Sequence, residues 1–251
     1  MTNFPHGSYR RRLRLIITQP DVVEAALEDD FHHFTVTLRH DGSHVVAMEG
    51  GAQRWPWSTC PQAAGPLHAL EGMPLSPRCL AVGEHANPKL NCTHMFDLAG
   101  LAVAHAARGG PVGTARQYDV EIPNGAQFGG EADVRVSRDG ELLQTWTLDG
   151  RSCVSPPPFS DVPWRGGFLR WADATFEPEE SEAVIVLRRA CDIGMGRGMD
   201  LDQYDTAKPL EPIMLGICFT MQPENIRVAL RNKDSVRDFD DNPDALLADG
   251  A

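Results

Sequence analysis

The sequence predicts an α+β fold in which antiparallel strands pack around a buried central helix. Several segments alternate between apolar and polar residues, the pattern of strands that bury one face. Asp-Gly pairs follow three of these segments, as expected for tight hairpin turns. The segment 93–108 is apolar on most sides, which predicts a helix enclosed by other elements.

The first half of the chain predicts a strand, a hairpin and two helices. Asp41-Gly42 is the expected hairpin turn. Pro61 suits the first turn of a helix that ends at Gly72, and Gly109-Gly110 ends the next helix. The expected elements are strands at 9–18, 31–39 and 45–49 and helices at 61–71 and 93–108.

The second half predicts a strand meander followed by helices. Ser155-Pro156-Pro157-Pro158 is the best linker candidate, and an acidic tail at 238–251 is expected to be disordered. We therefore expect two halves, 1–115 and 116–237, that form one compact unit. The expected elements are strands at 117–122, 131–138 and 142–148, a helical or irregular region at 167–172, a helix at 179–191, a strand or buried segment at 213–221 and a helix at 224–232.

Composition excludes several classes of function. The chain has 251 residues and a net charge of -12, which disfavours binding to phosphate backbones and anionic lipid. It contains no run of about 18 apolar residues, and residues 1–9 lack the apolar core of a secretory signal. We expect a cytoplasmic protein that binds a small-molecule substrate and neither nucleic acid nor membrane, with a homodimer as a possible assembly.

The six cysteines are scattered without a close pair, which argues against a zinc ribbon, a redox pair and a disulfide scaffold. Cys60 precedes Pro61 at a predicted helix start, where the helix dipole is expected to lower the pKa of the thiol. Arg54, Trp55 and Trp57 lie just before it as candidate substrate contacts. The alternative is that the two indoles only close the end of the core.

A second candidate site is the start of the helix at 93–108. Here we expect His94 to act as a general base, with Asp97 one turn later fixing its tautomer and Cys92 beside it. The alternative is that Thr93 and Asp97 only cap the helix. Cys60, Cys92 and His94 could also converge on zinc, although their spacing matches no short zinc motif.

Two other segments supply candidate binding residues. His32 and His33 are adjacent on a predicted strand, so only one of them can face a pocket, and His33 is retained as a candidate. The segment Gly194 to Asp200 resembles a phosphate loop, but it follows a helix and lacks the lysine and hydroxyl of a nucleotide loop. Arg197 remains a candidate anchor for a carboxylate or phenolate.

These residues also carry a family resemblance, which covers about the first half of the chain. The sequence resembles the bacterial family called domain of unknown function 2889, whose hallmarks are a cysteine-proline and a cysteine-threonine-histidine helix start. The family label names no reaction, so the resemblance indicates only where the site lies. The matching residues are His32-His33-Phe34, Arg54-Trp55-Pro56-Trp57-Ser58-Thr59-Cys60-Pro61, Gly72 and Cys92-Thr93-His94-Met95-Phe96-Asp97-Leu98.

The expected function is an enzyme that acts on a small aromatic or hydrophobic metabolite without a cofactor, with zinc as the one metal considered. A carbon–carbon lyase of aromatic catabolism is the best hypothesis, because the sequence shows no cofactor fingerprint and no nucleophile-elbow serine. The alternatives are a thiol-dependent hydrolase or transferase that uses Cys60 or Cys92, and a non-enzymatic module that binds zinc.

Overall fold

A computed structural model describes residues 7–127, 130–150 and 152–248 and divides the chain into two compact units. Of the described residues, unit 1 comprises those within 7–12, 116–200 and 238–248, and unit 2 comprises 13–115 and 201–237. Residues 201–237 belong to the same unit as residues 13–115. No helix of the described residues is long and apolar enough to cross a membrane.

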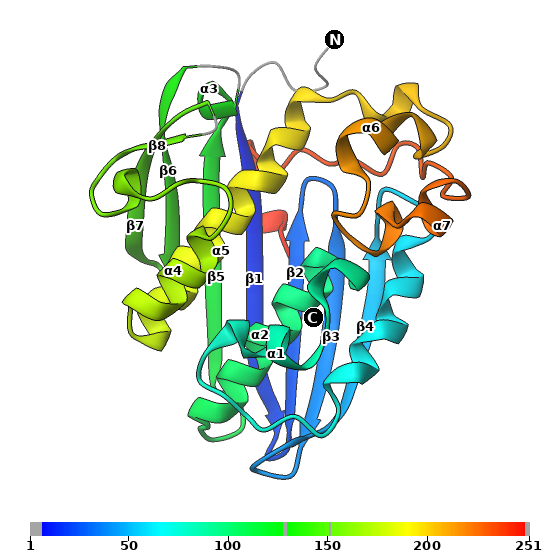
Figure 1. Cartoon of the computed structure of the whole chain (residues 1–251). Helices are drawn as coiled ribbons and strands as arrows, with labels where there is room; N and C mark the ends of the chain where they lie inside the picture. Colours follow the sequence, from blue (N-terminus) through cyan, green and yellow to red (C-terminus); the bar gives the residue numbers. More distant parts are fainter. Residues whose placement is uncertain (1–6, 128–129, 151, 249–251) are drawn as a thin grey trace. The chain divides into compact units, whose positions relative to one another are not determined.

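The α+β class is confirmed. The strands form one open eight-stranded antiparallel sheet in the order β4-β3-β2-β1-β5-β6-β7-β8 (Figure 1). The strands are β1 Ser8–Gln19, β2 Val22–Asp29, β3 His33–His40, β4 Val45–Arg54, β5 Ala115–Pro123, β6 Glu131–Arg138, β7 Glu141–Asp149 and β8 Ser152–Ser155.

In unit 2, the predicted hairpin joins β3 and β4. Gly42 takes the left-handed φ of 94° that the turn requires. The Asp41 carboxylate accepts hydrogen bonds from the amides of His44 at 2.7 Å and Ser43 at 2.8 Å. These bonds hold the pKa of Asp41 at about 2. The turn therefore fixes the register that buries Phe34, Val36 and Leu38.

The helix α2 runs from Thr93 to Arg108, as predicted, and packs on β2 and β3 (Figure 1). Gly100 allows a close approach to a neighbouring segment, since a Cβ at this position would lie 2.1 Å from the carbonyl oxygen of Cys79. The helix predicted at 61–71 is the 3-10 helix η1, Cys60–Leu70. The other short elements of this region are η2 Cys79–Ala81, α1 Val82–His85 and η3 Pro88–Leu90.

The segment 201–237 differs from its prediction. A strand or buried segment was expected at 213–221, but this stretch contains the end of α6 and the short helix η8, and the Ile213 side chain is 70% exposed. The helix expected at 224–232 is only one turn long. The elements here are η6 Leu201–Gln203, η7 Lys208–Leu210, α6 Glu211–Met214, η8 Phe219–Met221 and α7 Pro223–Ile226.

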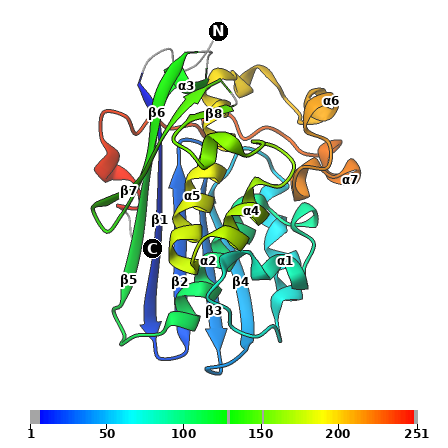
Figure 2. The same cartoon turned by 60° about the vertical axis from the view of Figure 1, so that its left-hand side comes forward.

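In unit 1, α5 (Pro178–Gly194) contacts β6 and β7. The helix α4 (Phe168–Thr175) packs beside α5 (Figure 2). The predicted linker follows β8 within this unit. Of the predicted tail, residues 238–248 also belong to unit 1, where Phe239 and Leu246 are buried, and residues 249–251 lie outside the described part. The short elements are α3 Asn124–Gln127, η4 Phe159–Asp161, η5 Met195–Gly198 and η9 Pro243–Ala245.

Candidate functional site

The imidazole rings of His32 and His94 meet in unit 2. His32 lies in the turn between β2 and β3, and His94 is in the first turn of α2, which packs on both strands. The two ring centroids are 3.8 Å apart and the planes are tilted by 31°. The Phe34 ring lies 5.5 Å from His32 and 5.8 Å from His94. Both histidines are buried, so the pair sits in a site with little water.

Asp29 holds the turn that presents His32. Its Oδ1 atom accepts hydrogen bonds from the amides of Phe31 and His32, both at 2.8 Å. The same oxygen lies 3.0 Å from His32 Nδ1. Because a carboxylate can only accept, Nδ1 carries the proton and Nε2 is the basic nitrogen of the neutral ring. The buried carboxylate thus fixes both the orientation and the tautomer of His32.

Arg54, a predicted substrate contact on β4, clamps this turn. Its guanidinium donates to the carbonyl oxygens of Asp30 at 2.9 Å and His32 at 3.2 Å, and it pairs with the Glu28 carboxylate at 3.1 Å. It also donates to the carbonyl oxygen of Ser235 at 3.1 Å. These contacts are those of a residue that supports the turn.

His33 is the first residue of β3, and its contacts differ from those of His32. Its Nδ1 atom is 3.7 Å from Glu28 Oε1, and it is paired in register with Arg54 on β4. Between these two adjacent histidines, the one that meets His94 is therefore His32. His33 instead joins the group of side chains that surrounds the clamp.

The thiols at the two helix starts are buried together. Burial raises the pKa of Cys60 to about 11, the opposite of the shift expected from a helix dipole, because loss of hydration outweighs the short 3-10 helix. Burial also raises the pKa of Cys92, and its neighbour Cys60 adds to the rise. Cys92 Sγ lies 3.8 Å from His94 Nδ1. The helices η1 and α2, whose starts carry these cysteines, contact each other, and burial keeps both cysteines as neutral thiols.

The segment 201–237 contacts the chain around the two predicted tryptophans. The Arg231 guanidinium lies 5.7 Å from the Trp57 ring centroid and donates to the Pro56 carbonyl oxygen at 2.7 Å. The Trp57 side chain is buried, whereas Trp55 is half-buried and its carbonyl oxygen accepts from Asn232 at 3.0 Å. The contacts of Trp57 fit the reading in which its indole closes the end of the core.

Asp97 and Arg197 are the last two predicted site residues. Asp97 is half-buried on α2, one turn after His94, and the carboxylate that groups with both imidazoles within 4.8 Å is that of Asp29. Arg197 belongs to unit 1, where it is fully buried and donates to Asn124 Oδ1 at 3.0 Å. It also pairs with Asp238 at 3.4 Å, so its described contacts hold its own unit together.

A possible metal-binding group lies at the imidazole pair. Within the described residues, the group of three potential ligands whose donor atoms all lie within 4.8 Å of one another is Asp29, His32 and His94. The zinc set considered from the sequence, Cys60, Cys92 and His94, does not form such a group in this part of the chain. The sequence signal for the observed group was the Asp29-to-His32 spacing of three residues, which suits a side-chain-capped turn.

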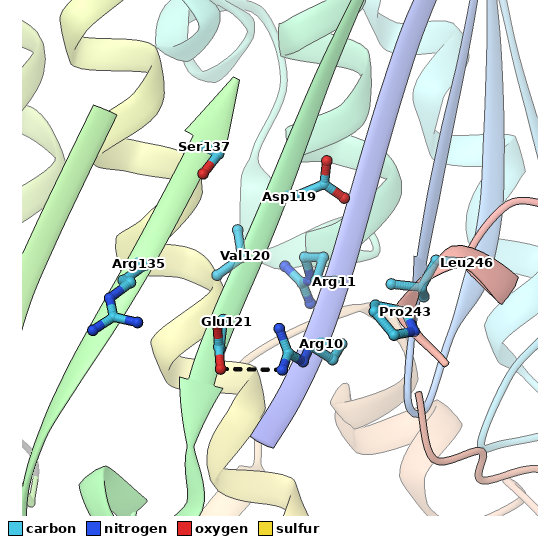
Figure 3. Close-up of a pocket in the computed structure, with 9 residues that line it drawn as sticks. All are labelled: Arg10, Arg11, Asp119, Val120, Glu121, Arg135, Ser137, Pro243 and Leu246. Carbon is cyan, nitrogen blue, oxygen red and sulfur yellow. Dashed lines mark ion pairs between the residues drawn. The ribbon is translucent and has the colours of Figure 1, made fainter. Parts of the chain in front are cut away.

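A shallow pocket in unit 1 has a volume of about 160 Å³ (Figure 3). The Arg10 guanidinium at its wall pairs with Glu121 at 3.1 Å and with Asp240 at 3.3 Å. Its lining mixes both signs of charge, which disfavours a dedicated anion site. The lining residues are Arg10, Arg11, Asp119, Val120, Glu121, Arg135, Ser137, Pro243 and Leu246.

The chain matches no protein-family model, and no curated protein matches it. The resemblance described above stays a prediction from its residues.

Proposed function

We propose that this protein is an enzyme that removes a proton from a small aromatic or other hydrophobic metabolite and then cleaves a carbon–carbon bond. The reaction class is that of a retro-aldol, formaldehyde-releasing or decarboxylating lyase of aromatic catabolism, in the cytoplasm. The supporting observation is the buried contact of His94 with His32, whose ring is held by Asp29. The partner is a small-molecule substrate, and nucleic acid and membrane have no part.

His94 is the proposed general base, on α2 as the central scaffold of the site. In a retro-aldol step it takes the proton of the substrate hydroxyl, the carbon–carbon bond breaks as the carbonyl forms, and the electron pair stays on the departing carbon until that carbon is protonated. His32 and Asp29 stabilise the charge that His94 gains, and they do so strongly because burial lowers the local dielectric. Asp97 stays the proposed residue that orients His94, and Trp55 and Trp57 stay candidate substrate contacts.

The structure bears on the thiol-dependent alternative. A neutral thiol is a poor nucleophile, and burial raises the pKa of both Cys60 and Cys92. The 3.8 Å separation of Cys92 Sγ and His94 Nδ1 still keeps a thiol next to a base. Treatment of the native protein with iodoacetamide separates the two enzymes, since full retention of activity favours the lyase.

The test is a turnover screen of the purified protein. Aromatic compounds that carry a β-hydroxyl or carboxyl side chain are incubated with it, and released formaldehyde and carbon dioxide are measured. We expect His94→Ala and His32→Ala to lower turnover by roughly 100-fold or more, the usual worth of a general base and its support. His68→Ala, at an exposed ion pair with Glu71, is the control and should keep wild-type turnover. Wild-type turnover by His94→Ala would contradict the assignment.

A further inference from the structure

We propose that Asp29, His32 and His94 bind one divalent transition-metal ion of the zinc or iron(II) class. Two imidazole nitrogens and one carboxylate oxygen form a donor set typical of these metals. The donor atoms already lie within 4.8 Å of one another. Bonds of about 2.1 Å allow donors to be roughly 4.2 Å apart at most, so small side-chain rotations close the site.

The arrangement around His32 suits a ligand more than a packing residue. Asp29 Oδ1 lies 3.0 Å from His32 Nδ1, which is close to the separation of two donor atoms that bind one ion at about 2.1 Å. The ion would take the place of the proton between these two atoms, so His32 would bind through Nδ1 and Asp29 through its carboxylate. The same carboxylate can still accept the hydrogen bonds of the turn amides.

The rigidity of the cluster also favours binding. The Asp29 carboxylate is held by two backbone amides, its turn is clamped by Arg54, and His94 is fixed on a buried helix. Ligands held in place lose little conformational freedom when an ion binds. A positive ion also offsets the cost of burying a carboxylate, which is high in a poorly hydrated site.

This inference uses the site of the proposed function but does not depend on the reaction. A metal-bound imidazole nitrogen cannot accept a proton, so ion binding and the general-base role of His94 exclude each other at that nitrogen. If His94 is the base, added metal should inhibit turnover, and a chelator should restore it. If the ion takes part in the reaction, a chelator should abolish turnover.

The test is calorimetric titration of the chelator-treated full chain with zinc chloride. We expect one ion per chain, and His32→Ala and His94→Ala should each weaken binding by at least about 100-fold. Loss of a ligand costs more than loss of the residue that orients one, which is worth roughly 10- to 100-fold. His68→Ala, at an exposed position, should bind as the wild type does. Absence of binding, or equal binding by the His32 and His94 variants, would overturn the proposal.

The variant Cys92→Ser tests whether a thiol ligand binds the ion, because the Cys92 thiol lies beside His94. Binding should survive this substitution, and cobalt(II) bound to the wild type should lack the intense near-ultraviolet band of a thiolate complex. If Cys92→Ser removes the ion while His32→Ala keeps it, the proposed ligand set is wrong. Circular dichroism shows whether each variant folds, and His32→Gln replaces any alanine variant that does not. Zinc binding is measured without a substrate. A protein that binds no zinc can therefore be distinguished from one that shows no turnover.

Discussion

The guanidinium of Arg54 joins two chain segments that are far apart in sequence. Its hydrogen bonds reach Asp30 and Ser235, and it forms an ion pair with the buried Glu28 carboxylate. Arg54→Met should lower the free energy of unfolding by about 3 kcal/mol, because it leaves a buried carboxylate and several carbonyl oxygens with fewer donors. Urea denaturation measures the change.

Arg39→Met is the matched control for Arg54→Met. Arg39 forms a surface ion pair with Asp21, and each side chain is about half exposed. Exposed pairs contribute at most about 1 kcal/mol, so this variant should stay close to the wild type. If both substitutions lower the free energy of unfolding by the same amount, the buried contacts of Arg54 stabilise the fold no more than a surface ion pair does.

The Cys60 thiol predicts a loss of stability at alkaline pH. Its pKa is about 11 in the folded protein, against an ordinary value of 9.0. Between these two values the folded state holds a proton that the unfolded state has lost, so the free energy of unfolding falls as pH rises, by about 1.4 kcal/mol per pH unit for one thiol. Below pH 9 this effect is absent.

Urea denaturation at pH 8.5 and pH 10.5 tests this prediction. Cys60→Ala removes one titrating group, so its stability should decline by about 1 to 2 kcal/mol less than that of the wild type over this interval. Burial raises the pKa of Cys92 and Cys218 as well, so part of the decline should remain in the variant. An unchanged pH dependence in Cys60→Ala would mean that this thiol does not titrate differently on unfolding.

At the scale of elements, α2 depends on one close approach. Gly100→Ala would place a Cβ 2.1 Å from the Cys79 carbonyl oxygen, and backbone cannot move aside as a flexible side chain can. We expect it to lower the free energy of unfolding by about 2 kcal/mol, although alanine favours helices. Gly83→Ala, in α1 with no atom within 4 Å of the added carbon, should be neutral or slightly stabilising. Thermal denaturation compares the two, and a neutral Gly100→Ala would refute the steric argument.

The elements that the sequence predicted well carry strong local signals. The helix α2 begins and ends where expected because an apolar run is bounded by a glycine pair. The strand β2 was missed because nearly every residue of Val22–Asp29 is buried, so no polar alternation marks it. The segment 213–221 was predicted wrongly because its apolar residues suggested burial, yet Ile213 is exposed.

The site was predictable only in part, for a similar reason. His94 stands in a recognisable helix start, but its partner His32 was set aside for His33 because alternation alone cannot say which face meets the helix. Asp29 belongs to a turn whose side-chain hydrogen bonds depend on the course of β2 and β3. Its contact with His32 is local in sequence, whereas the contact with His94 depends on how α2 packs on the strands.

At the scale of the whole molecule, neither unit is a continuous segment. Unit 2 needs residues 201–237, whose Arg231 and Thr220 contact Pro56 and Cys60 in the first half of the chain. We therefore expect the fragment 1–115 to lack cooperative thermal unfolding when it is produced alone. The full chain is the control, and a sharp transition in the fragment would show that residues 201–237 are dispensable for this unit.

The interleaved order of the segments also constrains when the protein can fold during its synthesis. The residues that close unit 2 leave the ribosome only after residue 237 has been made, and unit 1 waits for residues 238–248. The early strands β1 to β4 therefore wait for later segments to complete their packing, and until then their unpaired edges and apolar faces can contact other chains. We expect a chaperone to bind the nascent chain until residues 201–248 have emerged.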